Sequence, residues 1–143
     1  MKSYIFLEIL LKKIFLLLTL LTISLFAEYK NAYMSQEILD SKIPIVDVRT
    51  APEWKETGLL KGAIPIVFFS EQGQPLIDSF LKKLNEKVDT TKPFAIICHT
   101  GSRTSVIAPW LSKELNYNVL NISGGMDYAT KGLKLPTYPY TQK

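Results

Sequence analysis

The segment Phe94–Thr104 reads FAIICHTGSRT, and it decides the fold that the rest of the chain must complete. Residues 94–97 are wholly apolar, as expected for a central strand that is covered on both faces. Cys98 follows this run directly, and a helix is expected from about Thr104 to Leu115. The segment therefore predicts a buried strand that carries a cysteine at its carboxyl end, the edge at which open α/β sheets bind ligands.

Strand-like and helix-like segments alternate on both sides of this segment. Apolar runs with β-branched residues predict further strands at 43–48, 63–69 and 119–122. Helical spacing or capping signals predict helices at 33–41 (capped by Ser35), 51–58, 76–88 and 126–131. This alternation predicts an α/β fold, with a central, mostly parallel sheet of about five strands flanked by helices on both faces.

Local signals mark where several of these elements begin and end. Thr50 and Glu53 have the spacing of a capping box, and the helix that they open should end at Gly58. Pro65 is tolerated only at the edge or the end of a strand. Pro109 lies inside the helix that follows Cys98, where it predicts either a bend or an earlier helix end.

The first 27 residues have the pattern of a targeting segment. Lys12 and Lys13 precede the unbroken apolar run 14–26, which ends at the small residue Ala27. A basic flank before an apolar core of about 7–15 residues is typical of a secretory signal peptide, whereas a transmembrane helix needs roughly 20 apolar residues. We expect residues 1–27 to be a signal peptide, or otherwise an uncleaved N-terminal membrane anchor, and residues 28–143 to form one domain.

These features predict an exported protein of the bacterial periplasm, which contacts the inner membrane only if the N-terminal segment is not cleaved. The net charge of +4 is small and scattered, so it does not indicate nucleic-acid binding. The chain has one cysteine, so an internal disulfide is impossible. A lone cysteine is most often a buried, inert apolar residue, and that alternative applies to Cys98 until its surroundings are considered.

The loop after the central strand favours a reactive Cys98. Gly101 allows the loop to turn its backbone N–H groups inward around one atom, and the following helix N-terminus favours negative charge there. Arg103 adds a fixed positive charge that could hold an anionic substrate or the charge developing on sulfur. The hydroxyls of Ser102 and Thr104 could donate to the same centre. These groups would stabilise a thiolate by placement alone, without a metal, a cofactor or a general base.

Further candidate residues lie beside Cys98 or at the same sheet edge. Thr100 belongs to the active-site loop. His99 could tune the charge of this loop or touch the substrate, but a solvent-facing side chain is the favoured interpretation, because the loop acts through its backbone groups. Asp47 and Arg49 end the strand 43–48 and could support substrate binding. Such a pair more often forms an internal ion pair that fixes loops, here together with Glu53.

Four segments, in order, resemble the motifs of rhodanese-like domains. The loop Cys98-x-x-Gly101-x-Arg103-Thr104 resembles the active-site loop of that family. The other three are IVDVRT at 45–50 followed by Glu53-Trp54, GLLKGAI at 58–64, and NISGGMD at 121–127. The resemblance covers residues 33–137 and implies the rhodanese α/β fold, with Cys98 as the catalytic residue.

The resemblance also implies a chemistry. A rhodanese-type sulfurtransferase takes sulfane sulfur from a small donor such as thiosulfate, carries it as a persulfide on its cysteine, and passes it to a thiol, a protein or another nucleophile. Four residues separate Cys98 from Arg103, as in these enzymes, whereas related dual-specificity phosphatases have one more. A phosphatase-like or arsenate-handling enzyme is therefore disfavoured. A non-enzymatic binding or sulfur-carrier module with the same fold is the main alternative.

Overall fold

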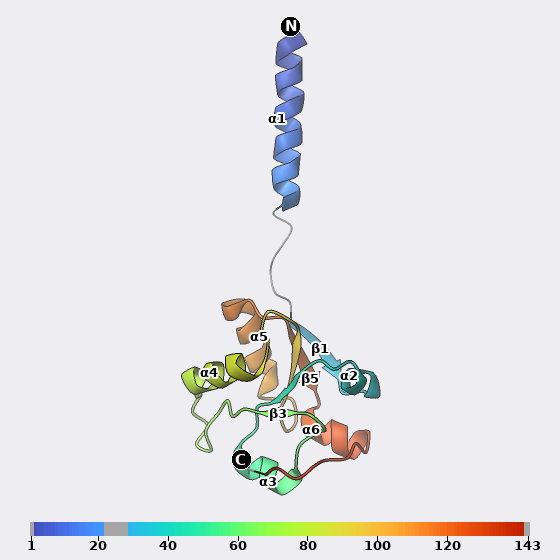
Figure 1. The fold of residues 1–143 in the computed structure, drawn as a ribbon, viewed down its shortest axis with the longest axis vertical. Helices are drawn as coiled ribbons and strands as arrows, with labels where there is room; N and C mark the ends of the chain where they lie inside the picture. Colours follow the sequence, from blue (N-terminus) through green and yellow to red (C-terminus); the bar gives the residue numbers. More distant parts are fainter. Residues whose placement is uncertain (1, 22–28, 142–143) are drawn as a thin grey trace.

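The structure is a computed structural model that describes residues 2–21 and 29–141 (Figure 1). Its first element is the helix α1 (Lys2–Leu21), which corresponds to most of the predicted targeting segment. Within the described ranges, no helix combines the length and the apolar character needed to cross a membrane. The predicted cleavage point after Ala27 lies outside the described residues, so cleavage stays a prediction.

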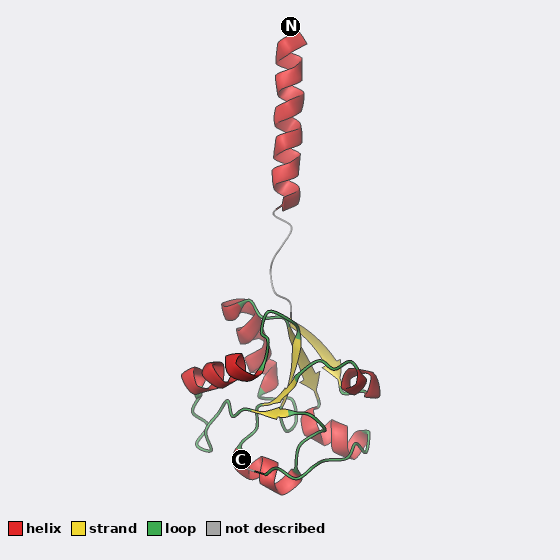
Figure 2. Ribbon diagram, in the orientation of Figure 1, coloured by secondary structure: helices red, strands yellow, loops and turns green. Residues whose placement is uncertain are grey.

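Residues 29–141 are built on a sheet in which every strand pair is parallel (Figure 2). Its strands are β1 (Tyr29–Tyr33), β2 (Ile45–Asp47), β3 (Ile64–Pro65), β4 (Phe94–Ile97) and β5 (Val119–Ser123). The spatial order is β1-β5-β4-β2-β3, which places β4 in the centre. The predicted parallel α/β sheet is therefore confirmed.

Helices cover both faces of this sheet, as predicted (Figure 1). They are α2 (Gln36–Asp40), α3 (Ala51–Thr57), α4 (Ile77–Lys87), α5 (Thr104–Leu115) and α6 (Gly125–Asp127), and α6 continues into a π-helical turn, η1 (Tyr128–Gly132). The helices α4 and α5 pack on one face, and α2 and α6 lie on the other. In parallel sheets this double cover excludes water from the central strands.

The side chains of β4 alternate between two cores, one on each face of the sheet. Phe94 and Ile96 pack into the core beneath α4 and α5, whereas Ala95 and Ile97 pack into the core beneath α2 and α6. All four are fully buried, which explains why the strand is apolar at every position. Cys98 continues the row of Phe94 and Ile96, so it leaves the strand already buried against α5.

The edges of the sheet differ most from the sequence prediction. The strand β1 was not predicted, because its residues are mostly exposed and show no apolar run. It forms by parallel pairing with β5. The predicted helix 33–41 is shorter and begins only at Gln36, where Ser35 caps it by accepting from the Ile38 N–H at 3.2 Å. At the other edge β3 has two residues instead of the predicted seven, and it ends at Pro65, as an edge position allows.

Two helices differ from expectation in their interiors. The helix α5 extends through Pro109 to Leu115, so the proline does not shorten it. Proline lacks an N–H for the Ser105 carbonyl, but residue 105 is exposed and water can satisfy that group. The predicted single helix 126–131 is instead the short α6 followed by η1, which begins at the Gly124-Gly125 turn.

Candidate active site

The thiol of Cys98 lies within a cradle formed by its own loop. The Gly101 N–H donates to Cys98 Sγ at 3.1 Å, and Gly101 has a φ of +95°, which favours glycine. The hydroxyl of Thr104 lies 3.7 Å from Sγ and 3.2 Å from the carbonyl oxygen of Gly101. Because this hydroxyl has one proton, which it donates to the Gly101 carbonyl, it can accept from the Cys98 thiol; donating to a thiolate would require it to turn away from that carbonyl. The loop can thus stabilise negative charge on this sulfur.

Burial determines how this sulfur can react. Cys98 is fully buried, and α5 begins at Thr104, directly behind the loop. The positive end of the helix dipole therefore adds to the stabilisation of an anion at Sγ. Because no part of Cys98 is exposed, a donor can reach Sγ only when the loop opens a path to it. A backbone N–H directed at the sulfur stabilises its thiolate form, so the hydrogen bond from Gly101 favours the reactive interpretation.

Arg103 forms a bidentate ion pair with Glu53, which lies in the first turn of α3. Nη1 of Arg103 donates to Oε2 of Glu53 at 2.9 Å, and Nη2 donates to Oε1 at 2.6 Å. Oε2 also accepts from the N–H and the hydroxyl of Thr50, both at 2.9 Å, so the predicted capping interaction is present. Such bidentate pairs are strong and geometrically specific. The pair joins the active-site loop to the start of α3.

The charges of this pair are strongly stabilised. Burial alone would raise the pKa of the Glu53 carboxyl, but hydrogen bonds from Arg103 and Thr50 outweigh it and hold that pKa at about 2. The hydrogen bond to Glu53 raises the pKa of Arg103 against the opposing effect of burial, and the neighbouring Cys98 raises it further. Both groups are therefore charged throughout the physiological pH range.

His99 lies between two carboxylates rather than pointing only into solvent. Its Nε2 is 3.1 Å from Oδ1 of Asp127, and its Nδ1 is 3.6 Å from Oε1 of Glu53. Asp127 also pairs with Lys131 at 2.9 Å, and this contact is the main reason why the pKa of Asp127 lies below its ordinary value. His99 thus hydrogen-bonds Asp127 and lies within ion-pair distance of Glu53, so it links α6 to the Glu53–Arg103 pair.

The two remaining loop residues do not face the sulfur. The hydroxyl of Thr100 donates to the hydroxyl of Ser102 at 3.3 Å, and both residues are exposed. The expectation that the Ser102 hydroxyl reaches the sulfur centre is therefore wrong in this arrangement. Ser102 lies two residues before α5, and its side chain is exposed, whereas the N–H of Gly101 donates to Sγ.

Asp47 and Arg49 form a fully buried ion pair that fixes neighbouring backbone. Nη2 of Arg49 lies 2.7 Å from Oδ2 of Asp47 and donates to the carbonyl of Gly58 at 2.8 Å, while Nη1 donates to the Thr57 hydroxyl at 2.6 Å. These contacts hold the end of β2 against the end of α3, as the ion-pair interpretation predicts. Glu53 is not part of this pair, because Arg103 takes its carboxylate.

The Gly124-Gly125 turn holds the carbonyl side of the active-site loop. The N–H groups of Met126 and Asp127 donate to the carbonyls of Cys98 and His99 at 2.8 and 2.9 Å. A Cβ on Gly125 would lie only 2.5 Å from each of those two carbonyl oxygens. Glycine is therefore required for α6 to approach the loop this closely.

An open hollow of about 590 Å³ lies beside Arg103. Its lining residues come from the start of α3, the segment after β3 and the active-site loop: Thr50, Pro52, Glu53, Phe69, Ser70, Glu71, Gly73 and Arg103. A short antiparallel bridge between Phe69 and Pro75 closes the second of these segments. The hollow offers space for the part of a substrate that remains outside the loop.

Among residues 2–21 and 29–141, no three His, Cys, Asp or Glu side chains are grouped to hold a metal ion.

Comparison with known proteins agrees with this geometry. The family model described as the rhodanese-like domain matches residues 27–130. The chain belongs to this family. The uncharacterized protein RP600 of Rickettsia prowazekii is 34% identical over 108 residues, which cover 72% of this chain and 86% of that protein. The resemblance of the four motifs is thus confirmed at the level of the whole domain.

Solved rhodanese-like structures have the same fold. Reduced Bacillus anthracis CoADR-RHD superposes with a TM-score of 0.57 at 29% identity, over 79% of this chain and 18% of that longer one. Rv0390 of M. tuberculosis gives a TM-score of 0.56 at 18% identity, over 68% of this chain and 80% of that one, and so supports the fold alone. Together these similarities confirm the rhodanese-like fold of residues 29–141.

Sequence reasoning did not assign Glu53 and Asp127 to the site. Glu53 was interpreted as a capping residue and as a partner of Arg49, although it lies 50 positions from its actual partner Arg103. Asp127 lies 28 positions from His99. Both residues belong to segments that resemble rhodanese motifs, Glu53 to the first and Asp127 to the closing one, and this membership could have indicated that they lie near the active-site loop.

Replacing Gly125 by alanine should displace the loop, because the new Cβ would collide with two carbonyl oxygens. We expect G125A to lower the free energy of unfolding by more than about 2 kcal/mol and to alter the reactivity of Cys98. The matched control is G62A, which has a similar positive φ but no atom within 4 Å of the new Cβ, and should cost only about 1 kcal/mol. Urea unfolding measures both. Equal losses would contradict the proposed close approach.

The Glu53 carboxylate should stabilise the fold in a pH-dependent manner. Its pKa falls from 4.5 to about 2 on folding, so its contribution is complete above pH 4.5 and is lost as the pH falls toward 2. The difference in unfolding free energy between wild type and Glu53→Gln should therefore be constant near neutral pH and shrink across that acidic interval. Chemical unfolding at several pH values tests this, with the exposed Glu86→Gln as control. A pH-independent difference would exclude an ionised, paired Glu53.

Proposed function

We propose that the chain is a sulfurtransferase that carries sulfane sulfur as a persulfide on Cys98. The observation that carries this proposal is the 3.1 Å hydrogen bond from the Gly101 N–H to Cys98 Sγ, at the carboxyl edge of the sheet. The same cradle can hold the outer sulfur of a persulfide, which is anionic and accepts N–H donors. Membership of the rhodanese-like family supports a fold of the sulfurtransferase type.

The proposed reaction has two balanced steps. The Cys98 thiolate attacks the outer sulfur of a donor such as thiosulfate; a new S–S bond forms at Cys98, the donor S–S bond breaks, and sulfite leaves with the bonding electron pair. A thiolate of a small molecule or a protein then attacks the outer sulfur of the persulfide, and the Cys98 thiolate is released. Both steps are nucleophilic displacements at sulfur, and neither requires a cofactor.

The alternative is a rhodanese-fold module that binds a partner without catalysis. Such a module does not require a thiolate-stabilising N–H or an arginine held beside the cysteine, and this chain has both. A phosphatase-like reaction is disfavoured by the four-residue spacing between Cys98 and Arg103, since phosphate needs the wider loop. Sulfur transfer therefore remains the function that the geometry supports best.

The persulfide can be tested directly by mass spectrometry. Purified protein incubated with thiosulfate or with an alkyl persulfide should gain the mass of one sulfur atom, and dithiothreitol should remove it. Cys98→Ser should lose this gain completely, because the nucleophile is absent. Ser102→Ala is the control and should retain it, since the Ser102 hydroxyl bonds to Thr100 and not to Sγ. If wild type gains no sulfur from either donor, the proposed function is wrong.

The proposal includes export, which the basic flank and apolar run of residues 12–27 support. When the full sequence is expressed in a Gram-negative host, the protein recovered from the periplasmic fraction should lack residues 1–27. A variant without residues 2–27 should stay in the cytoplasm. Full-length protein in the membrane fraction would favour the anchor alternative over cleavage. Full-length protein in the cytoplasm would contradict export.

A further inference from the structure

The positive charge of Arg103 is compensated by the carboxylate of Glu53. Both terminal nitrogens of its guanidinium donate to the two oxygens of Glu53, at 2.6 and 2.9 Å. The side chains of Arg103 and Glu53 are each 24% exposed, so solvent screens the pair only in part. The sequence alone suggested that Arg103 attracts an anionic substrate. In the folded protein its charge is compensated before any substrate arrives.

The other charges around the loop do not replace this lost attraction. Glu71 lines the same hollow as Glu53 and Arg103. On the α6 side, Lys131 is compensated by Asp127, which also faces His99. Apart from His99, these side chains comprise three carboxylates, of Glu53, Glu71 and Asp127, against two cations, of Arg103 and Lys131. The approach to Cys98 is therefore slightly negative, and it should repel a dianion more strongly than a neutral molecule or a monoanion.

We propose that Glu53 is a specificity-determining residue that selects sulfur donors by charge. By pairing with Arg103 it disfavours the thiosulfate dianion, and it favours sulfane sulfur carried on a thiol with an uncharged R group, RSSH, which has at most one negative charge. This inference rests on the proposed sulfurtransferase function and identifies the donor class of the same site.

The reaction with such a donor is balanced without an added oxidant or reductant. The Cys98 thiolate attacks the outer sulfur of RSSH, and the donor S–S bond breaks. The electron pair leaves with the inner sulfur, which takes up the proton and departs as the thiol RSH, while Cys98 retains an anionic persulfide. The R group would remain in the hollow beside Arg103, which Phe69 and Pro52 line.

The test measures how fast Cys98 is loaded by two donors, thiosulfate and the persulfide of 2-mercaptoethanol. Quenched samples are analysed by mass spectrometry for the added sulfur. Wild type should load from the persulfide at least about tenfold faster than from thiosulfate at equal concentration. In Glu53→Gln the thiosulfate rate should rise on the order of tenfold, because Arg103 becomes available to the dianion, whereas the persulfide rate should change about twofold or less.

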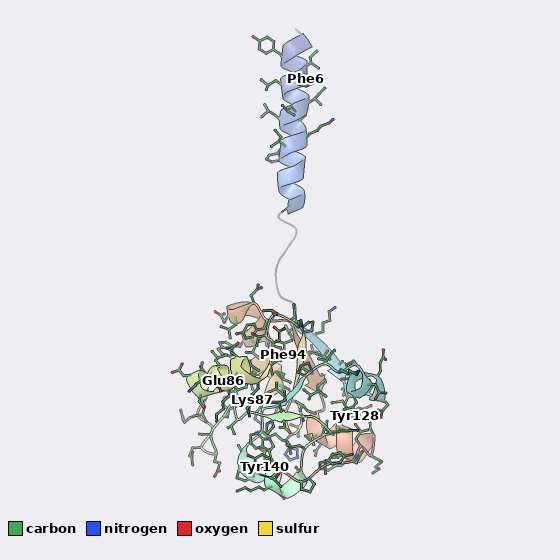
Figure 3. All side chains as sticks on the ribbon, in the orientation of Figure 1. Phe6, Glu86, Lys87, Phe94, Tyr128 and Tyr140 are labelled. Atoms are coloured by element: carbon green, nitrogen blue, oxygen red, sulfur yellow. The ribbon has the colours of Figure 1, made fainter. Side chains whose placement is uncertain are left out.

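A matched control separates the local pair from the overall charge. Glu86→Gln changes the net charge by the same amount, but Glu86 lies in the last turn of α4 (Figure 3), which leads to the amino end of β4 and away from Cys98. This variant should load both donors at wild-type rates. Thermal unfolding checks that each variant is folded.

The dependence of the loading rate on ionic strength gives a second readout. In wild type the thiosulfate rate should stay level or rise as salt is added, because salt screens repulsion; in Glu53→Gln it should fall. A steep fall in wild type would overturn the inference, as would a wild-type preference for thiosulfate. Equal slowing of both donors in Glu53→Gln would show that Glu53 only positions the loop. Absence of loading by either donor in wild type would instead refute the sulfurtransferase function itself.

Discussion

The parallel pairing of β4 on both sides is the constraint on which the site depends. β2 pairs with β4 so that Asp47 lies beside Ile97, and β5 pairs with β4 so that Asn121 lies beside Ile96. Because all strands run in one direction, three strand ends meet at one edge. That edge gathers the Asp47–Arg49 pair, the active-site loop and the Gly124-Gly125 turn. An antiparallel partner on either side would have carried one of these groups to the opposite edge.

The loop itself is held from three directions, and this determines where its one reactive atom lies. The N–H groups of Met126 and Asp127 bind its first two carbonyls, and Arg103 binds Glu53 at the start of α3. The Thr104 hydroxyl bridges back to Gly101. With these polar groups occupied by one another, the Gly101 N–H remains directed at Sγ. Buried polar groups are costly when unpaired, so the network resists rearrangement.

Reactivity and selectivity come from different parts of this arrangement. The hydrogen bond from Gly101 and the nearby helix N-terminus stabilise negative charge on sulfur, and they belong to the loop and to α5. The charge seen by an approaching donor depends instead on Glu53, Asp127 and Glu71, which come from other elements. A rhodanese-like domain can therefore keep its nucleophile while its donor preference changes through residues outside the loop.

The sequence by itself determined the parallel α/β fold, the central strand with its cysteine, the capping of α3 and the family. Each of these follows from local patterns, because strand burial, helix caps and loop glycines are encoded by neighbouring residues. The tertiary structure alone decided that Glu53 pairs with Arg103 and not with Arg49, that His99 faces Asp127, that Ser102 turns outward, and that residues 29–33 form a strand. The pairs Glu53–Arg103 and His99–Asp127 join residues far apart in the sequence, so they depend on which elements the sheet order places side by side. The residues of β1 are mostly exposed and show too little apolar pattern to be recognised as a strand without the partner strand β5.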